Sequence, residues 1–131
     1  MQIKTFVEKN PEPEALKRLA EAVGKVVNDR GIFVNNIPKE SARAISAILK
    51  VHFPHAQIWL FGSRATGKNR PGSDIDIAID EGTPIDFSRL AQARDALEES
   101  TIPYKVDLVD YTTVTTEFRE EIKTKGVEWI F

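Results

Sequence analysis

The sequence contains no cysteine, and none of its apolar runs approaches the roughly 18 residues that a membrane-spanning helix needs. The lack of cysteine excludes disulfide frameworks, zinc–thiolate centres and thiol nucleophiles. Residues 1–8 also lack the apolar core of a signal peptide. We therefore expect a cytoplasmic protein without membrane contact. At 131 residues, of which 41% are hydrophobic, it has enough apolar material to form a folded core.

A strong net charge is also missing, because 18 Lys and Arg residues stand against 20 Asp and Glu residues and give a formal net charge of −2. A general nucleic-acid binder needs a basic field to hold the phosphate backbone. The composition therefore argues against general nucleic-acid binding. It leaves room for a local site that holds a single nucleotide.

Hydrophobic periodicity predicts the order helix, helix, strand, strand, helix, strand, helix, strand. Apolar residues at spacings of three and four predict helices at about 16–27, 38–53, 86–100 and 115–124. Runs of β-formers or alternating apolar residues predict strands at about 56–61, 74–79, 104–109 and 127–131. Val51 and Phe87 are assigned to the apolar sides of their helices. The pattern predicts an α+β fold with a small mixed β-sheet covered by helices.

A loop rich in glycines, hydroxyls and cations joins the first two predicted strands. Glycine allows backbone N–H groups to approach a ligand closely, and a turn of successive N–H groups binds anions. The loop lacks the Gly-Lys-Ser/Thr spacing of a P-loop. The candidate ligand-binding residues of the loop are Gly62, Ser63, Arg64, Lys68, Arg70 and Ser73.

Two carboxylates follow this loop directly. Asp74 and Asp76 stand two residues apart in a predicted strand, so their side chains point to the same face, whereas Ile75 and Ile77 point to the other. Such pairs are often only a solvated surface. Aspartate is a poor strand former, however, and adjacent carboxylates repel unless a cation lies between them. Beside a phosphate-binding loop, the pair indicates a magnesium site.

A third carboxylate is available in the predicted strand 104–109. Asp107 is flanked by Val106 and Leu108, so it faces away from their side. If this strand lies beside the one that carries Asp76, the carboxylates converge and can hold metal ions or accept a proton. Asp110 is the alternative, although turn formation also explains it. We favour Asp107.

The string Gly62-Ser63, ten residues, Asp74-Ile75-Asp76 resembles the signature of the nucleotidyltransferases of the DNA polymerase β superfamily. The longer string, from Phe61-Gly62-Ser63-Arg64 to Ser73-Asp74-Ile75-Asp76-Ile77, resembles the minimal nucleotidyltransferase (MNT) branch. The likeness extends over about residues 41–131 and implies a polymerase-β-like fold. We accordingly divide the chain into an N-terminal helical extension, 1–36, and a nucleotidyltransferase domain, 37–131.

The resemblance implies roles for these residues. Gly62 and Ser63 bind the phosphates of ATP, Asp74 and Asp76 bind magnesium, with two Mg²⁺ ions expected, and Asp107 is the third catalytic and metal-binding carboxylate. The reaction is attack of an acceptor hydroxyl on the α-phosphate of ATP. The partner implied is a HEPN-type toxin, which the chain neutralises as an antitoxin by attaching AMP to a tyrosine.

Two departures from the MNT pattern accompany this resemblance. Thr66 stands where the branch often has arginine, and residues 1–36 exceed the minimal core. Other functions also fit the same residues. The acceptor can be a small molecule or RNA, or the chain can be a non-catalytic antidote that covers its partner.

Overall fold

A four-stranded sheet of order β3-β2-β1-β4 forms the centre of the computed structural model, which describes residues 37–129. The strands are β1 (Gln57–Phe61), β2 (Ile75–Asp80), β3 (Val106–Asp110) and β4 (Val127–Trp129). β1 pairs antiparallel with both β2 and β4, whereas β2 and β3 run parallel. The predicted small mixed sheet is confirmed.

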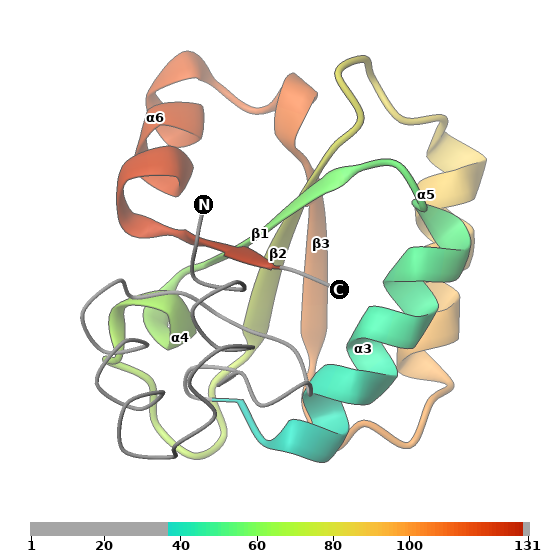
Figure 1. The fold of residues 1–131 in the computed structure, drawn as a ribbon, viewed down its shortest axis with the longest axis vertical. Coiled ribbons are helices and arrows are strands. Elements are labelled where there is room, and N and C mark those ends of the chain that lie inside the picture. The colour runs from blue at the N-terminus through green and yellow to red at the C-terminus, as the bar shows by residue number, and fades with distance from the viewer. Residues whose placement is uncertain (1–36, 130–131) are drawn as a thin grey trace, which may run out of the picture.

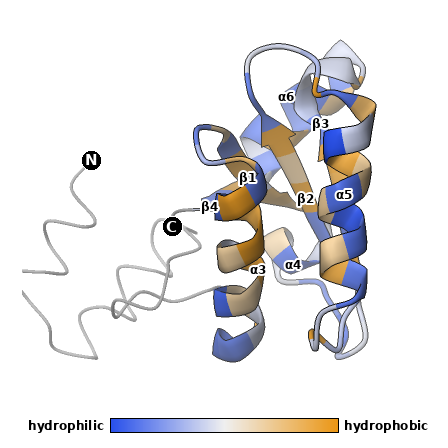
Figure 2. Cartoon of the chain, turned by 90° about the vertical axis from the view of Figure 1, so that its right-hand side faces the viewer, coloured by the Kyte–Doolittle hydropathy of each residue, from blue (hydrophilic) through white to orange (hydrophobic). Residues whose placement is uncertain are grey.

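Two helices, α3 (Lys39–His52) and α5 (Phe87–Glu98), lie side by side on one face of the sheet (Figures 1 and 2). α6 (Thr116–Lys125) packs against β1 and leads into β4. These helices confirm the predicted ones. The short helices α4 (Ser63–Thr66) and η1 (Tyr111–Thr113) were not predicted, because each is too short to show a period. The helix predicted at 16–27 lies outside the described residues.

Alternation along the strands builds the core on the face covered by α3 and α5. Ile75, Ile77 and Ile79 of β2 are fully buried, as the sequence predicts. Burying a side chain of this size contributes about 1.5–3 kcal/mol. Buried residues of the other elements that join this core are Ile45, Leu49, Phe53, Ile58, Leu60, Leu97, Leu108 and Trp129. One face of the sheet therefore supplies the apolar core, and Asp76 of β2 and Asp107 of β3 fall on the other.

Two apolar residues expected on buried helix faces are instead 77% exposed, namely Val51 and Phe87. Val51 follows the buried Leu49 by two residues, which turns its side chain about 200° around the helix axis. Phe87 is the first residue of α5, and the first buried residue of that helix is Leu90. Phe87 therefore lies before the part of α5 that packs on the core. Both assignments were wrong. No helix within residues 37–129 is long and apolar enough to cross a membrane.

A close approach fixes the junction between α6 and β4. A Cβ atom at Gly126 would overlap the carbonyl oxygen of Ile122 and would lie 2.8 Å from the carbonyl oxygen of Leu60. Both obstacles are backbone atoms, which cannot rotate away. The chain can therefore pass from α6 into β4, beside β1, only with glycine at this position.

We predict that Gly126→Ala lowers the free energy of unfolding by about 1–3 kcal/mol, because the added methyl group forces backbone shifts in a packed region. Urea denaturation of the purified variant measures this. Gly72→Ala is the matched control, since a Cβ at Gly72 meets nothing within 4 Å. An equal loss of stability in both variants would contradict the steric explanation.

Candidate active site

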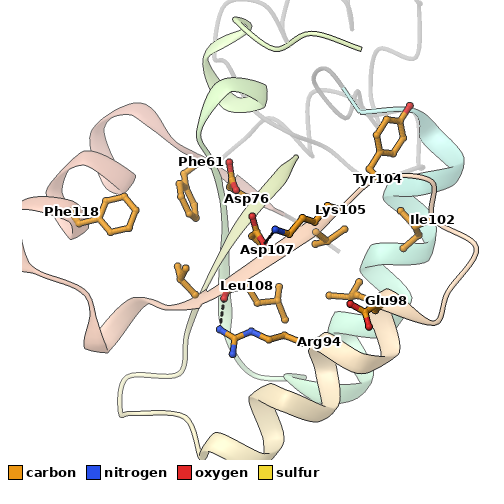
Figure 3. Close-up of a pocket in the computed structure, with 13 residues that line it drawn as sticks. Phe61, Asp76, Arg94, Glu98, Ile102, Tyr104, Lys105, Asp107, Leu108 and Phe118 are labelled. Carbon is orange, nitrogen blue, oxygen red and sulfur yellow. Dashed lines mark hydrogen bonds and ion pairs between the residues drawn. The ribbon is translucent and has the colours of Figure 1, made fainter. Parts of the chain in front are cut away.

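The sheet face opposite α3 and α5 brings two carboxylates together. The parallel register of β2 and β3 places Asp76 directly opposite Asp107. Both side chains point away from the isoleucine side, and Figure 3 shows them next to each other at the centre of a cavity. Neighbouring strands are about 4.8 Å apart, so the two carboxylates lie within reach of one bound ion. As the sequence indicated, convergence of these carboxylates depends on β2 and β3 being neighbours, and the two strands are neighbours.

The carboxylates are held in an electrostatically unfavourable arrangement. Partial burial raises the pKa of Asp76, and the negative charges of Asp107 and Asp74 raise it further. Lys105 opposes this effect, and its Nζ lies 3.7 Å from Oδ1 of Asp107. One exposed ammonium group thus faces a cluster of acids. The arrangement favours binding of a further cation.

Asp74 lies one residue before β2 and is exposed to solvent. It is near enough to raise the pKa of Asp76. Over residues 37–129, however, no three acidic or histidine side chains are grouped closely enough to hold a metal ion on their own. The structure therefore brings Asp76 and Asp107 together, with Asp74 beside them at the end of the loop.

The carboxylate of Asp110 is hydrogen-bonded within the protein and does not face the cavity. It is buried, and its carboxylate accepts hydrogen bonds from the backbone N–H of Ile85 at 2.8 Å, from the backbone N–H of Thr112 at 3.0 Å and from the Thr112 hydroxyl at 2.9 Å. It caps the η1 helix. Its position opposite Ile79 also places it on the core side of the sheet. Turn formation, the explanation that the sequence offered for Asp110, agrees with these contacts.

Gly62 connects the loop to the carboxylates. Its φ angle of 78° lies in the left-handed region that favours glycine, and a Cβ atom here would overlap Oδ2 of Asp76. The backbone at Gly62 therefore lies directly against the Asp76 carboxylate. A phosphate held by this turn would lie next to Asp76, as nucleotide chemistry at the paired carboxylates requires.

The rest of the loop is held in shape by Arg64. This arginine is buried, and its guanidinium donates to the carbonyl oxygens of Ser73 at 3.0 Å and Pro71 at 3.2 Å. It also lies over the ring of Tyr104, 4.7 Å from the ring centroid. The hydroxyl of Ser73 accepts a hydrogen bond from the backbone N–H of Arg70 at 2.8 Å. Arg64 and Ser73, which the sequence offered as ligand-binding residues, thus make internal loop contacts.

The paired carboxylates open into a cavity of about 760 Å³. Figure 3 shows that it runs along β3 towards α5, with Lys105 and Arg94 on its walls. Arg94 donates a 2.8 Å hydrogen bond to the carbonyl oxygen of Leu108. On the other side, Phe61 and Phe118 form an edge-to-face pair with ring centroids 5.4 Å apart. The cavity is large enough for a small ligand or a protruding side chain of a partner.

Sequence reasoning missed Lys105 and Phe118 as parts of this site. Lys105 stands two residues before Asp107, so the strand period gave a usable signal that it shares the face of Asp107. Phe118 gave none, because its contact with Phe61 joins residues far apart in the chain. Lys68 of the loop is exposed and lines a second cavity of about 430 Å³.

The donors fit a hard divalent cation. Magnesium is bound by one or two carboxylates together with substrate phosphates, and it keeps several waters. Asp76 and Asp107 supply two carboxylates that repel each other, and Asp74 stands close to them. A site of this kind needs no complete protein cage.

We predict that Asp76→Asn raises the melting temperature in metal-free buffer at about pH 7, because it removes a repelled carboxylate. The raised pKa of Asp76 means that the folded protein binds this proton more tightly than the unfolded chain. The contribution of Asp76 to stability is therefore most favourable below the unfolded pKa of about 3.9, and it is lost as the pH rises through the folded value. The gain from Asp76→Asn should shrink as the pH falls towards about 4. Thermal melts over this range measure the trend, and a constant gain or a loss at neutral pH would contradict it.

Comparison with known proteins agrees with this geometry. Residues 43–130 match the family described as polymerase beta, nucleotidyltransferase. A protein of Haemophilus influenzae named "Probable protein adenylyltransferase MntA" is 38% identical over 88 residues, which cover 67% of this chain and 77% of that protein.

Solved structures are also similar. A chain from a crystal structure of a toxin–antitoxin with AMP-PNP is 29% identical, with a TM-score of 0.59, over 68% of this chain and 72% of that one. A chain from the complex of the tri-AMPylated Shewanella oneidensis HEPN toxin with MNT antitoxin is 26% identical, with a TM-score of 0.55, over 70% of this chain and 71% of that one. The resemblance carried by Gly62-Ser63 and Asp74-Ile75-Asp76 is confirmed, and the chain belongs to the polymerase β nucleotidyltransferase family, in its minimal nucleotidyltransferase branch.

Proposed function

We propose that this protein is a metal-dependent protein adenylyltransferase that transfers AMP from ATP to a tyrosine hydroxyl of a HEPN-type toxin, in the cytoplasm, and thereby acts as an antitoxin. The observation that carries the proposal is the Asp76–Asp107 pair, with Gly62 directly against it. The relatives support the rest, since one is named as a probable protein adenylyltransferase and another is a chain from the complex of a tri-AMPylated HEPN toxin with MNT antitoxin.

Each group of residues in the site has a separate role in the proposed reaction. The Gly62–Ser63 turn binds the phosphates of ATP and holds the α-phosphate beside Asp76. Asp74, Asp76 and Asp107 would hold two Mg²⁺ ions, which neutralise phosphate charge and polarise the α-phosphate when bound. Arg64 and Ser73 keep the loop in the shape that this requires. Catalysis then rests on positioning and on electrostatic stabilisation.

Asp107 has the best position to accept a proton. It lies beside Asp76 and lines the larger cavity, from which an acceptor hydroxyl can enter. The hydroxyl oxygen bonds to the α-phosphorus, and the bond from that phosphorus to the bridging oxygen of pyrophosphate breaks. The hydroxyl proton passes to Asp107 and the electron pair leaves with pyrophosphate. Lys105, paired with Asp107, adds positive charge near the reacting phosphate.

We predict that the purified protein, incubated with ATP, Mg²⁺ and the HEPN-type protein encoded beside it, adds one or more AMP units to that partner. Intact-mass measurement detects the gain, and peptide mapping locates it on a tyrosine. Asp76→Asn and Asp107→Asn should each slow transfer by at least about 100-fold, because electrostatic stabilisation of the transferred group is lost. Asp80→Asn is the control, since Asp80 lies on the same strand, lines neither cavity and accepts a hydrogen bond from the Gly82 N–H.

The alternatives give different results in the same assay. Neutralisation of the partner by Asp76→Asn protein, without any mass gain in the wild type under any divalent metal, would show a binding antidote in place of an enzyme. AMP transfer to RNA or to a small molecule, with an unmodified protein partner, would replace the proposed acceptor. Full transfer by Asp107→Asn would remove Asp107 from the catalytic residues.

A further inference from the structure

A second cavity of about 430 Å³ lies between the glycine-rich loop and α6. The loop contributes Gly62, Thr66 and Lys68, and β1 contributes Phe61. The residues of α6 that line it are Phe118, Glu121, Ile122 and Lys125. Nothing in the sequence motifs points to Lys125, which stands in a charged helical stretch that reads as a solvated surface.

The two cavities adjoin each other at Phe61 and Phe118. Phe61 and Phe118 line both cavities, so this aromatic pair forms a wall between them. Gly62 lies on the side of the smaller cavity and Asp76 on the side of the larger one. Because Gly62 packs directly against the Asp76 carboxylate, a phosphate chain bound there can extend from one cavity to the other.

The charges of the two cavities differ in sign. In the larger cavity, Arg94 and Lys105 stand against three acids, Asp76, Glu98 and Asp107. Lys105 is already paired with Asp107, and Arg94 already donates to a backbone carbonyl. In the smaller cavity, Lys68 and Lys125 stand against Glu121 alone. A polyphosphate is therefore better accommodated in the smaller cavity.

Both lysines of the smaller cavity have ammonium groups that pair with no carboxylate within residues 37–129. The backbone that carries them is nevertheless fixed. The N–H of Lys68 donates to the Ser63 carbonyl oxygen at 3.0 Å. Lys125 ends α6 immediately before Gly126, which is enclosed by backbone atoms of α6 and β1. The two cations are thus anchored on opposite walls and remain available to a ligand.

We propose that Lys68 and Lys125 bind the β- and γ-phosphates of the nucleotide in this smaller cavity, so that pyrophosphate departs on the α6 side. The inference rests on the proposed nucleotidyl transfer and names its leaving-group subsite. In-line displacement requires the acceptor and the leaving group to lie on opposite sides of the α-phosphorus. The acceptor hydroxyl therefore enters from the larger cavity, where Asp107 lies.

The test compares Lys125→Ala with Lys123→Ala, which removes the same charge from the same helix. Lys123 does not line the cavity, and its Nζ lies 5.7 Å from the ring centroid of Tyr111. Calorimetric titration with inorganic pyrophosphate and Mg²⁺ should give about tenfold weaker binding for Lys125→Ala, the usual effect of losing one charge-assisted hydrogen bond. Lys123→Ala should match the wild type, and Lys125→Arg should restore binding. AMP, which lacks these phosphates, should bind wild type and Lys125→Ala equally.

Two outcomes would overturn the assignment. One is that the wild type binds no pyrophosphate. The other is that Lys125→Ala and Lys123→Ala bind pyrophosphate equally well. A wild type that binds pyrophosphate through Lys125 but transfers no AMP would instead overturn the proposed function and leave the anion site in place. In the transfer assay, Lys125→Ala should raise the KM for ATP more than it changes kcat.

Discussion

The parallel register of β2 and β3 forces Asp76 and Asp107 to face each other, and the rest of the domain holds this repulsive pair in place. Neither side chain can turn to the other face of the sheet. Asp76 alternates with fully buried isoleucines, so turning it inward would also turn Ile75 and Ile77 out of the core. The free energy gained by burying the isoleucines thus offsets the repulsion between the carboxylates on the other face. Such strain is typical of sites that a substrate or metal completes.

The loop before β2 also helps to fix the position of Asp76. Arg64 of this loop donates hydrogen bonds to the carbonyl oxygens of Pro71 and Ser73 and packs over the ring of Tyr104. These contacts of Arg64 fix the path of the chain between β1 and β2. That path brings Gly62 against Asp76 in a backbone conformation suited to glycine. The loop and the open sheet face meet where Gly62 contacts Asp76. The two cavities on either side of the Phe61–Phe118 pair give the acceptor and the leaving group separate directions of approach and departure.

Much of this architecture could be predicted from the sequence, because it follows from short-range patterns. The isoleucine alternation in β2 indicated which face Asp76 would occupy, and the apolar neighbours of Asp107 did the same for β3. What could not be predicted depends on contacts between distant residues. Arg64 packs over the ring of Tyr104, which belongs to a later part of the chain, and α6 places Phe118 against Phe61. Exposure of Phe87 depends on where α5 begins relative to the core, which helical spacing alone does not reveal.

The proposed chemistry requires metal and nucleotide binding at the Asp76–Asp107 pair. A crystal of the protein soaked with Mn²⁺ and a non-hydrolysable ATP analogue tests this directly, because manganese is located by its anomalous scattering. We predict a peak within about 2.0–2.6 Å of carboxylate oxygens of Asp76 and Asp107, with the α-phosphate of the analogue bound to the same ion beside Gly62. A nucleotide bound elsewhere, or manganese bound away from both carboxylates, would show that this pair is not the catalytic centre.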